Sequence, residues 1–102
     1  MSDASVSVAF DPATEVLDIR LSGEIDIASA PALRAELLSH VVRHRPARLL
    51  VQLDEVTFFG AEGMRLLHDL GARSGASIDL RCTAGAPARR VLELFCNGLA
   101  AR

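Results

Sequence analysis

The stretch RLLVQLDEVTFFGAEGMRLLHDLGARSG, residues 48–75, decides the fold, because one hydrophobic pattern gives way to another inside it. Residues 48–54 form a short, mostly apolar run, which is typical of a strand covered on both faces, and we expect it to lie centrally in a sheet. From residue 61 onward the apolar residues Met64, Leu67 and Leu70 recur at helical spacing. A buried strand that leads directly into an amphipathic helix indicates an α/β domain.

The rest of the chain continues this alternation of strands and helices. Turn-forming Asp11 and Pro12 separate two alternating segments and predict a β-hairpin. Ser29 is a suitable N-cap for the first helix, and Pro46 predicts where that helix ends. The expected elements are strands at 5–10 and 15–23, a helix at 29–45, a strand at 48–54, a helix at 61–75, a strand at 76–82 and a helix at 86–99.

This order predicts one mixed sheet. Strands that alternate with helices pair in parallel through right-handed crossovers, whereas the first two strands pair as an antiparallel hairpin. We therefore expect an α/β fold with a mixed four-stranded sheet, an N-terminal hairpin and about three helices packed on the sheet. A chain of 102 residues can bury one core but not two, so residues 1–102 are expected to form a single domain.

Composition excludes several classes of function. The net charge of -2 gives no basic footprint for nucleic acid or anionic membranes, and the absence of lysine removes Schiff-base and P-loop chemistry. No segment approaches the roughly 18 apolar residues that span a membrane, and the first residues do not resemble an export signal. Cys82 and Cys96 lie in apolar runs without a CxxC pattern, so we expect them to be reduced and buried. These features predict a cytoplasmic protein without direct membrane insertion.

The histidines and paired acids do not predict catalysis. His40 and His44 have the i, i+4 spacing of a metal pair, but no third ligand is evident, so we expect solvent-facing residues in a last helical turn. No nucleophile motif accompanies His68. The acid pairs Glu24 with Asp26 and Asp54 with Glu55 follow strands, where polar turn residues are common. We expect no enzyme activity, no cofactor and no metal.

The segment GAEG, residues 60–63, has the spacing of a glycine loop that binds phosphate. It lacks the Gly-Lys-Ser/Thr of a P-loop, and Glu62 would repel the phosphates that a KH-type loop binds. The pattern instead predicts a helix start, with Gly60 as the N-cap and Glu62 favourably placed in the field of the helix dipole. The N–H groups of such a start are open to an anion or to a docking partner.

Three stretches in register resemble the STAS family, the domain of anti-sigma factor antagonists. The resemblance implies a STAS fold and a protein-binding function: such antagonists dock an anti-sigma factor, typically a serine kinase of the GHKL type, and free a sigma factor to direct transcription. The stretches are LSGEIDIASAPALRAEL (21–37), LLVQLDEVTFFGAEGMRLL (49–67) and APARRVLELFCNGL (86–99).

In this family the kinase phosphorylates a Ser of an Asp-Ser-Ser-Gly signature. In the alignment with that signature Gly60 takes the Asp position, Ala61 the phospho-acceptor position, Glu62 the second Ser and Gly63 the Gly. Ala61 has no hydroxyl group, so the usual phosphorylation switch is expected to be lost. Two roles stay open for Glu62, a fixed charge that imitates the phosphate or stabilisation of the helix start. Thr57 has a hydroxyl group and is therefore a substitute acceptor for the phosphoryl group, although its place at a strand end favours a structural role.

The resemblance also implies where a partner binds. We expect the docking surface at the start of the second helix and at the turn after the second strand, although Glu24 and Asp26 have the alternative role of ordering that turn. Phe58 is expected in the core, because adjacent residues of a strand face opposite ways. The expected partner-binding residues are Phe59, Gly60, Ala61, Glu62, Gly63, Met64, Arg65, His68, Glu24, Asp26 and Ile27.

A second function stays open. Short, stand-alone STAS proteins also serve as accessory subunits of bacterial phospholipid-transport ABC complexes, where they bind the ATPase subunit. Many family members continue past the position of Gly98 and Leu99 with another strand and helix, whereas this chain stops three residues later. We therefore expect a domain that is short at its C-terminus.

Overall fold

The computed structural model describes residues 4–82 of the chain. Strands and helices alternate there in the predicted order. The predicted helix at 86–99 and Cys96 lie outside the described residues. The elements are β1 (Ser5–Asp11), β2 (Val16–Ile25), α1 (Ala30–His44), β3 (Arg48–Phe59), α2 (Ala61–Ser74) and β4 (Ser77–Arg81).

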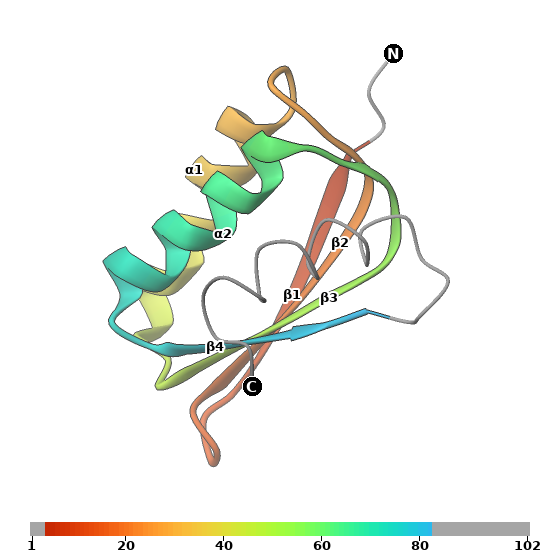
Figure 1. Ribbon diagram of the computed structural model, residues 1–102. Helices are drawn as coiled ribbons and strands as arrows, with labels where there is room; N and C mark the ends of the chain where they lie inside the picture. The colour runs from red at the N-terminus through yellow and green to blue at the C-terminus, as the bar shows by residue number, and fades with distance from the viewer. Residues whose placement is uncertain (1–3, 83–102) are drawn as a thin grey trace.

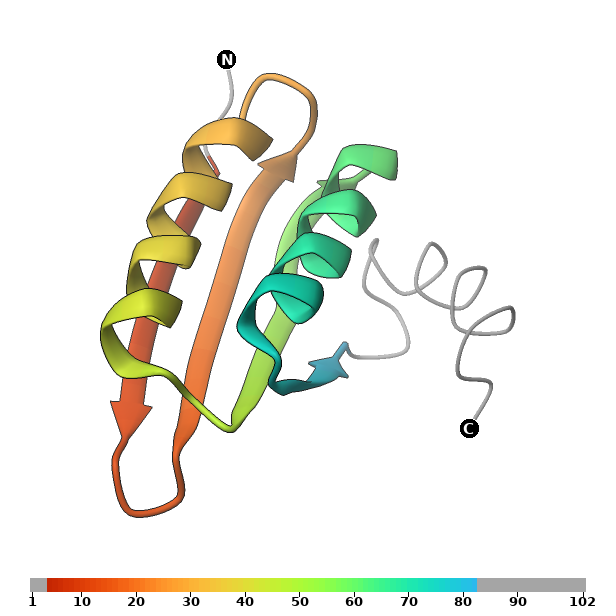
Figure 2. The ribbon, with the colours of Figure 1, turned by 90° about the vertical axis from the view of Figure 1, so that its left-hand side faces the viewer.

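The four strands form one mixed sheet in the order β1-β2-β3-β4. β1 and β2 pair antiparallel as the predicted hairpin, whereas β3 pairs parallel with β2, and β4 pairs parallel with β3. The central position predicted for β3 is confirmed. Both helices lie on the same face of the sheet, with α1 over β1 and β2 and α2 over β3 (Figures 1 and 2). Residues 4–82 therefore form two layers with a core between them.

The core consists of the apolar side chains that the strands and helices turn toward each other. Alternation along β2 up to Leu21 and along β3 up to Leu53 directs every second side chain to the helices, and the apolar stripes of α1 and α2 cover them. Burial of each such Leu, Ile or Val side chain stabilises the fold by roughly 1.5–3 kcal/mol before the entropy cost. The completely covered residues include Leu17, Ile19, Ile25, Leu37, Leu49, Val51, Leu53, Leu66 and Leu70.

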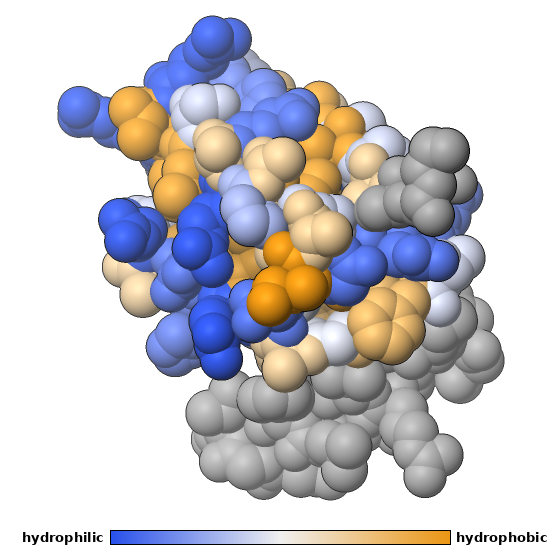
Figure 3. All heavy atoms as spheres, turned by 90° about the horizontal axis from the view of Figure 1, so that it is seen from above, coloured by the Kyte–Doolittle hydropathy of each residue, from blue (hydrophilic) through white to orange (hydrophobic). Residues whose placement is uncertain are grey.

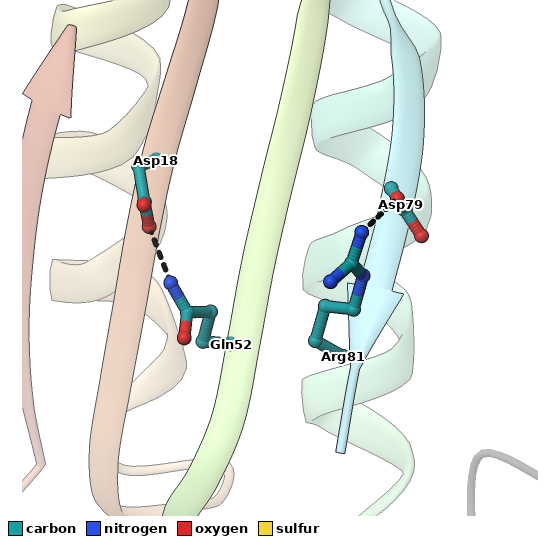
Figure 4. Close-up of polar contacts among 4 residues, drawn as sticks. All are labelled: Asp18, Gln52, Asp79 and Arg81. Atoms are coloured by element: carbon teal, nitrogen blue, oxygen red, sulfur yellow. Dashed lines mark hydrogen bonds and ion pairs between the residues drawn. The ribbon is translucent and has the colours of Figure 1, made fainter.

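The other face of the sheet carries polar side chains. The side-chain amide of Gln52 on β3 donates a hydrogen bond of 2.8 Å to the carboxylate of Asp18 on β2 (Figure 4). On β4, Arg81 lies 3.3 Å from Asp79. The two faces of the sheet thus differ in chemistry, and the helices cover the apolar one.

β3 is longer and less regular than the sequence predicts. It extends to Phe59 instead of residue 54, and its pairing with β2 shifts register twice along the second half. Each shift exchanges the faces to which the following side chains point, so Leu53, Val56 and Phe59 are buried at intervals of three. Phe59 is 3% exposed and Phe58 is 52% exposed. The prediction that Phe58 belongs to the core and Phe59 to the surface is therefore wrong.

The end of α1 also differs from prediction. The ring of His44 stacks on that of Phe10 in β1, with 4.6 Å between the centroids, and the ring of His40 lies 6.2 Å from that of His44. Both histidines are half-buried, because β1 lies against this side of α1, so the prediction of solvent-facing residues is wrong. Cys82 is likewise half-buried instead of buried.

No group of three metal-ligating side chains lies together within residues 4–82. Neither helix in this part of the chain is long and apolar enough to cross a membrane.

Candidate protein-binding surface

Three segments meet at one end of the molecule: the turn between β2 and α1, the end of β3 and the first turn of α2. The N–H of Gly60 donates to the carbonyl of Ile25 at 3.3 Å and ties the segments together. Parallel β2 and β3 both end here, so their last residues lie side by side. We call this end the apical surface and define it by Glu24, Ile27, Ala28, Phe58, Gly60, Ala61, Glu62 and Arg65.

The turn between β2 and α1 is held by a small set of hydrogen bonds. The carboxylate of Asp26 accepts bonds from the N–H groups of Ala28 and Ser29, both at 3.0 Å. The Ser29 hydroxyl donates to the carbonyl of Glu24 at 2.7 Å and accepts from the N–H of Asp26 at 3.0 Å. Ser29 occupies the N-cap position, as predicted, but its side chain bonds the turn and not the helix. Asp26 therefore orders the turn, which was one of its two expected roles.

The pKa of Asp26 reflects these bonds. The hydrogen bond from the Ser29 backbone N–H is the main cause that holds the pKa of this carboxyl below its ordinary value of 3.8, although partial desolvation acts in the opposite direction. The ionised carboxylate is thus the form that fits the folded turn.

Two large apolar side chains are exposed on the apical surface. Ile27 in the turn is 76% exposed and Phe58 at the end of β3 is 52% exposed. The Phe58 ring lies against Gly60, where an added Cβ would be only 3.1 Å from it. Figure 3 looks onto this end and shows hydrophobic side chains with hydrophilic ones beside them. Exposed apolar groups gathered within a polar rim are typical of protein-binding sites.

The first turn of α2 begins without a side-chain cap. Gly60 is the N-cap residue, and its carbonyl accepts the N–H groups of Gly63 at 3.0 Å and Met64 at 3.4 Å. The N–H groups of Ala61 and Glu62 precede these and have no acceptor within the helix. Ala61 is exposed in this first turn.

Glu62 is engaged by its own helix. Its carboxylate lies 3.4 Å from the guanidinium of Arg65, one turn further along. The Glu62 side chain is 27% exposed and that of Arg65 is 64% exposed. A carboxylate in a first helical turn is also stabilised by the helix dipole. Of the two roles open to Glu62, this arrangement favours stabilisation of the helix start.

Comparison with known proteins assigns the fold to a family. Residues 8–96 match the family model described as "Mlab, STAS domain". The chain belongs to the STAS domain family. It is similar to the anti-sigma-F factor antagonist RsfB of two Mycobacterium tuberculosis strains, CDC 1551 and H37Rv, with 31% identity over 92 residues that cover 89% of this chain and 75% of the relative.

Solved structures agree with this STAS assignment. An anti-sigma factor antagonist from Mycobacterium paratuberculosis superposes with a TM-score of 0.74 at 26% identity and covers 95% of this chain and 81% of its own. An antisigma-factor antagonist STAS domain from Rhodobacter sphaeroides gives a TM-score of 0.60 at 15% identity, over 76% and 84% of the two chains, and shares the fold.

The STAS domain brings together most of the residues predicted for partner binding, but not all of them. Arg65 and His68 are exposed on α2, as expected. Phe59, Gly63 and Met64 are buried beneath the surface, so the prediction that these three residues are presented to a partner is corrected. They support the apical surface from below, because the Phe59 ring packs directly against Gly63.

Phe58 and Ala28 are the apical residues absent from the predicted set, and Phe58 is the large apolar one. A strict two-residue alternation cannot place both Val56 and Phe59 in the core. The interval of three between Leu53, Val56 and Phe59 was the available signal for an irregular strand, and that signal leaves Phe58 on the surface.

Proposed function

We propose that this STAS domain is an anti-sigma factor antagonist, which binds an anti-sigma factor through its apical surface and so frees a sigma factor. The exposure of Ile27 and Phe58 beside the start of α2 is the observation that carries the proposal. The names of the similar proteins supply the class of partner. The function is therefore binding, without catalysis, in the cytoplasm, where sigma factors act.

The partner that we propose is a serine kinase of the GHKL type. Position 61 corresponds, by resemblance to the family signature, to the residue that such a kinase usually phosphorylates, and Ala61 has no hydroxyl group to accept a phosphoryl group. The complex would then not be released by phosphorylation at this position. Its formation would be controlled by the amount of each protein or by the state of the partner.

The alternative of an accessory subunit for a phospholipid-transport ABC ATPase is not favoured. Both curated relatives and both solved structures named above are antagonists of anti-sigma factors. The alternative predicts a different partner, so one experiment separates the two functions.

Affinity capture from the native cell tests the proposal. The tagged wild-type chain and a tagged variant with Ile27→Ala and Phe58→Ala would be purified in parallel, and the retained proteins identified by mass spectrometry. We expect an anti-sigma factor with the wild-type chain and its loss with the variant. An ABC ATPase retained in its place would contradict the proposal.

A further inference from the structure

β1 lies at an edge of the sheet, and between Ser5 and Phe10 it lacks the charge, proline or bulge that usually protects an edge. Among residues 4–82 it pairs with one strand, β2, in a regular register over its whole length. Its sequence SVSVAFD contains no Lys, Arg or Pro, its one charged residue is the terminal Asp11, and its pairing with β2 has no bulge. Edge strands that avoid association usually carry a charge, a proline or a bulge. The outermost position of β1 is visible in Figure 2.

We propose that β1 pairs antiparallel with β1 of a second copy of this chain and joins two four-stranded sheets into one. A two-fold axis at Val8 would place Val6 opposite Phe10 on the helix side. On the other side, Ser7 would face Ala9, and Ser5 would face Asp11. Apolar residues thus meet apolar ones, and no two like charges are opposed.

Burial along β1 supports this pairing. Val6, Val8 and Phe10 pack against the core but stay half-buried, whereas the alternate residues of the strand are exposed. A neighbouring strand would cover the open side of these three side chains. Register is specified where one face of a strand is apolar, because a slip by one residue would turn that face to solvent.

Helix α1 is compatible with the same axis. Phe10 stacks on His44. The two residues from Phe10 back to Val8 span about 6.6 Å of strand, and about four residues of a helix span the same length. Four residues back from His44 along α1 is His40. His40 therefore lies near the axis, and its Nδ1 is buried without a hydrogen-bond partner in the described part of the chain.

The charges on α1 complement each other across this axis. Glu36 and Arg43 are exposed, four residues before His40 and three residues after it, which places them on the same side of the helix. That side faces away from Arg34, which pairs with Asp69 of α2 at 3.3 Å. In an antiparallel arrangement Glu36 of each copy would lie near Arg43 of the other.

The pairing is independent of the proposed function, because the residues of the β1 edge are not part of the apical surface. A single strand pair and two facing helices form an interface at or below the low end of about 1,200 Å² for specific complexes. We therefore expect a reversible dimer that forms as the protein concentration rises, and that leaves both apical surfaces open.

Sedimentation velocity over a concentration series tests the pairing. Ser7 and Ala9 are exposed, so both positions accept charged side chains without loss of core packing. In the variant with Ser7→Lys and Ala9→Lys, each Lys faces a Lys of the other copy, and we expect a monomer at all concentrations. In the control with Ser7→Lys and Ala9→Glu, each Lys faces a Glu, and we expect a dimer.

Circular dichroism of both variants confirms that they fold. A wild-type chain that stays monomeric up to about 1 mM would overturn the proposal. A dissociation constant above that concentration, at so small an interface, corresponds to non-specific association. Equal dimerisation of the two variants would overturn it as well, because the charge arrangement would then have no effect.

Discussion

The ring of Phe59 fills the space that a side chain at position 63 would need: a Cβ built on Gly63 would lie 2.6 Å from Cε1 of Phe59. Gly63→Ala should therefore displace a buried ring and lower the free energy of unfolding by roughly 1–3 kcal/mol, the usual cost of overpacking. Urea unfolding of the two proteins measures this difference.

A matched control lies in the same helix. A Cβ on Gly71 would be 3.9 Å from its nearest neighbour, Ile78, so Gly71→Ala should leave stability unchanged or raise it by up to about 1 kcal/mol through helix propensity. Replacement of Phe59 by Leu in the Gly63→Ala background should recover part of the loss. Equal effects at positions 63 and 71 would show that the ring is not the cause.

The exposed apolar side chains of the apical surface should dominate partner binding. Phe58→Ala and Ile27→Ala should each weaken the affinity for the anti-sigma factor by about fivefold or more, as truncation of an interface anchor does. Isothermal titration calorimetry with the purified partner gives the dissociation constants. Val42→Ala is the matched control, because Val42 is 72% exposed but lies on α1 away from this end. A loss of affinity with Val42→Ala as large as with Phe58→Ala would place the interface elsewhere.

The parts of the fold that sequence predicted are those set by local periodicity. The alternation before Gly23 predicted the hairpin, and the spacing of Met64, Leu67 and Leu70 predicted the buried side of α2. The register shifts arise from the pairing of β3 with β2, so the sequence of either strand alone does not reveal them. For that reason the surroundings predicted for Phe58 and Phe59 are the reverse of those in the structure.

The candidate site was located by resemblance, because its residue types are common in turns. Ile27 is an ordinary apolar residue in the sequence, and it becomes informative when its exposure is known. The role of Asp26 depends on the turn geometry that brings the N–H groups of Ala28 and Ser29 to one carboxylate oxygen.

Stability should depend on pH through Asp26. Its pKa is lowered in the folded state, so it stabilises the fold above its ordinary value of 3.8, and this contribution is lost as the pH falls through the lowered pKa. Asp26→Ala should therefore be less stable than the wild type at pH 7, and the difference should shrink in acid below the ordinary value. Urea unfolding at a series of pH values measures it. A difference that grows toward acid pH would contradict the assignment.

Glu62 should have a small effect on binding. Since its carboxylate is paired with Arg65 within α2, Glu62→Gln should leave the affinity for the partner within about twofold of the wild type. The helix start would lose a favourable charge, which lowers the free energy of unfolding by up to about 1 kcal/mol. Calorimetry and urea unfolding separate the two effects. A gain in affinity of tenfold or more would instead support the imitation of a phosphate, because removal of the charge would then relieve repulsion.

Restoration of a hydroxyl group at position 61 should restore control by phosphorylation. Ala61 is exposed in the first turn of α2, so Ser in its place would be accessible to a kinase partner that supplies ATP. A phosphate adds a charge of about -1.5 to -2 beside Glu62 and next to the exposed Phe58, which opposes an apolar interface. The Ala61→Ser variant should thus be phosphorylated and released from the kinase partner, whereas the wild-type chain should stay bound. Native mass spectrometry measures both the added phosphate and the loss of the complex. Ala28→Ser, at another exposed alanine of the apical surface, is the control and should stay unmodified. Phosphorylation of the wild-type chain at Thr57 with release of the partner would show that a different residue has taken over the switch.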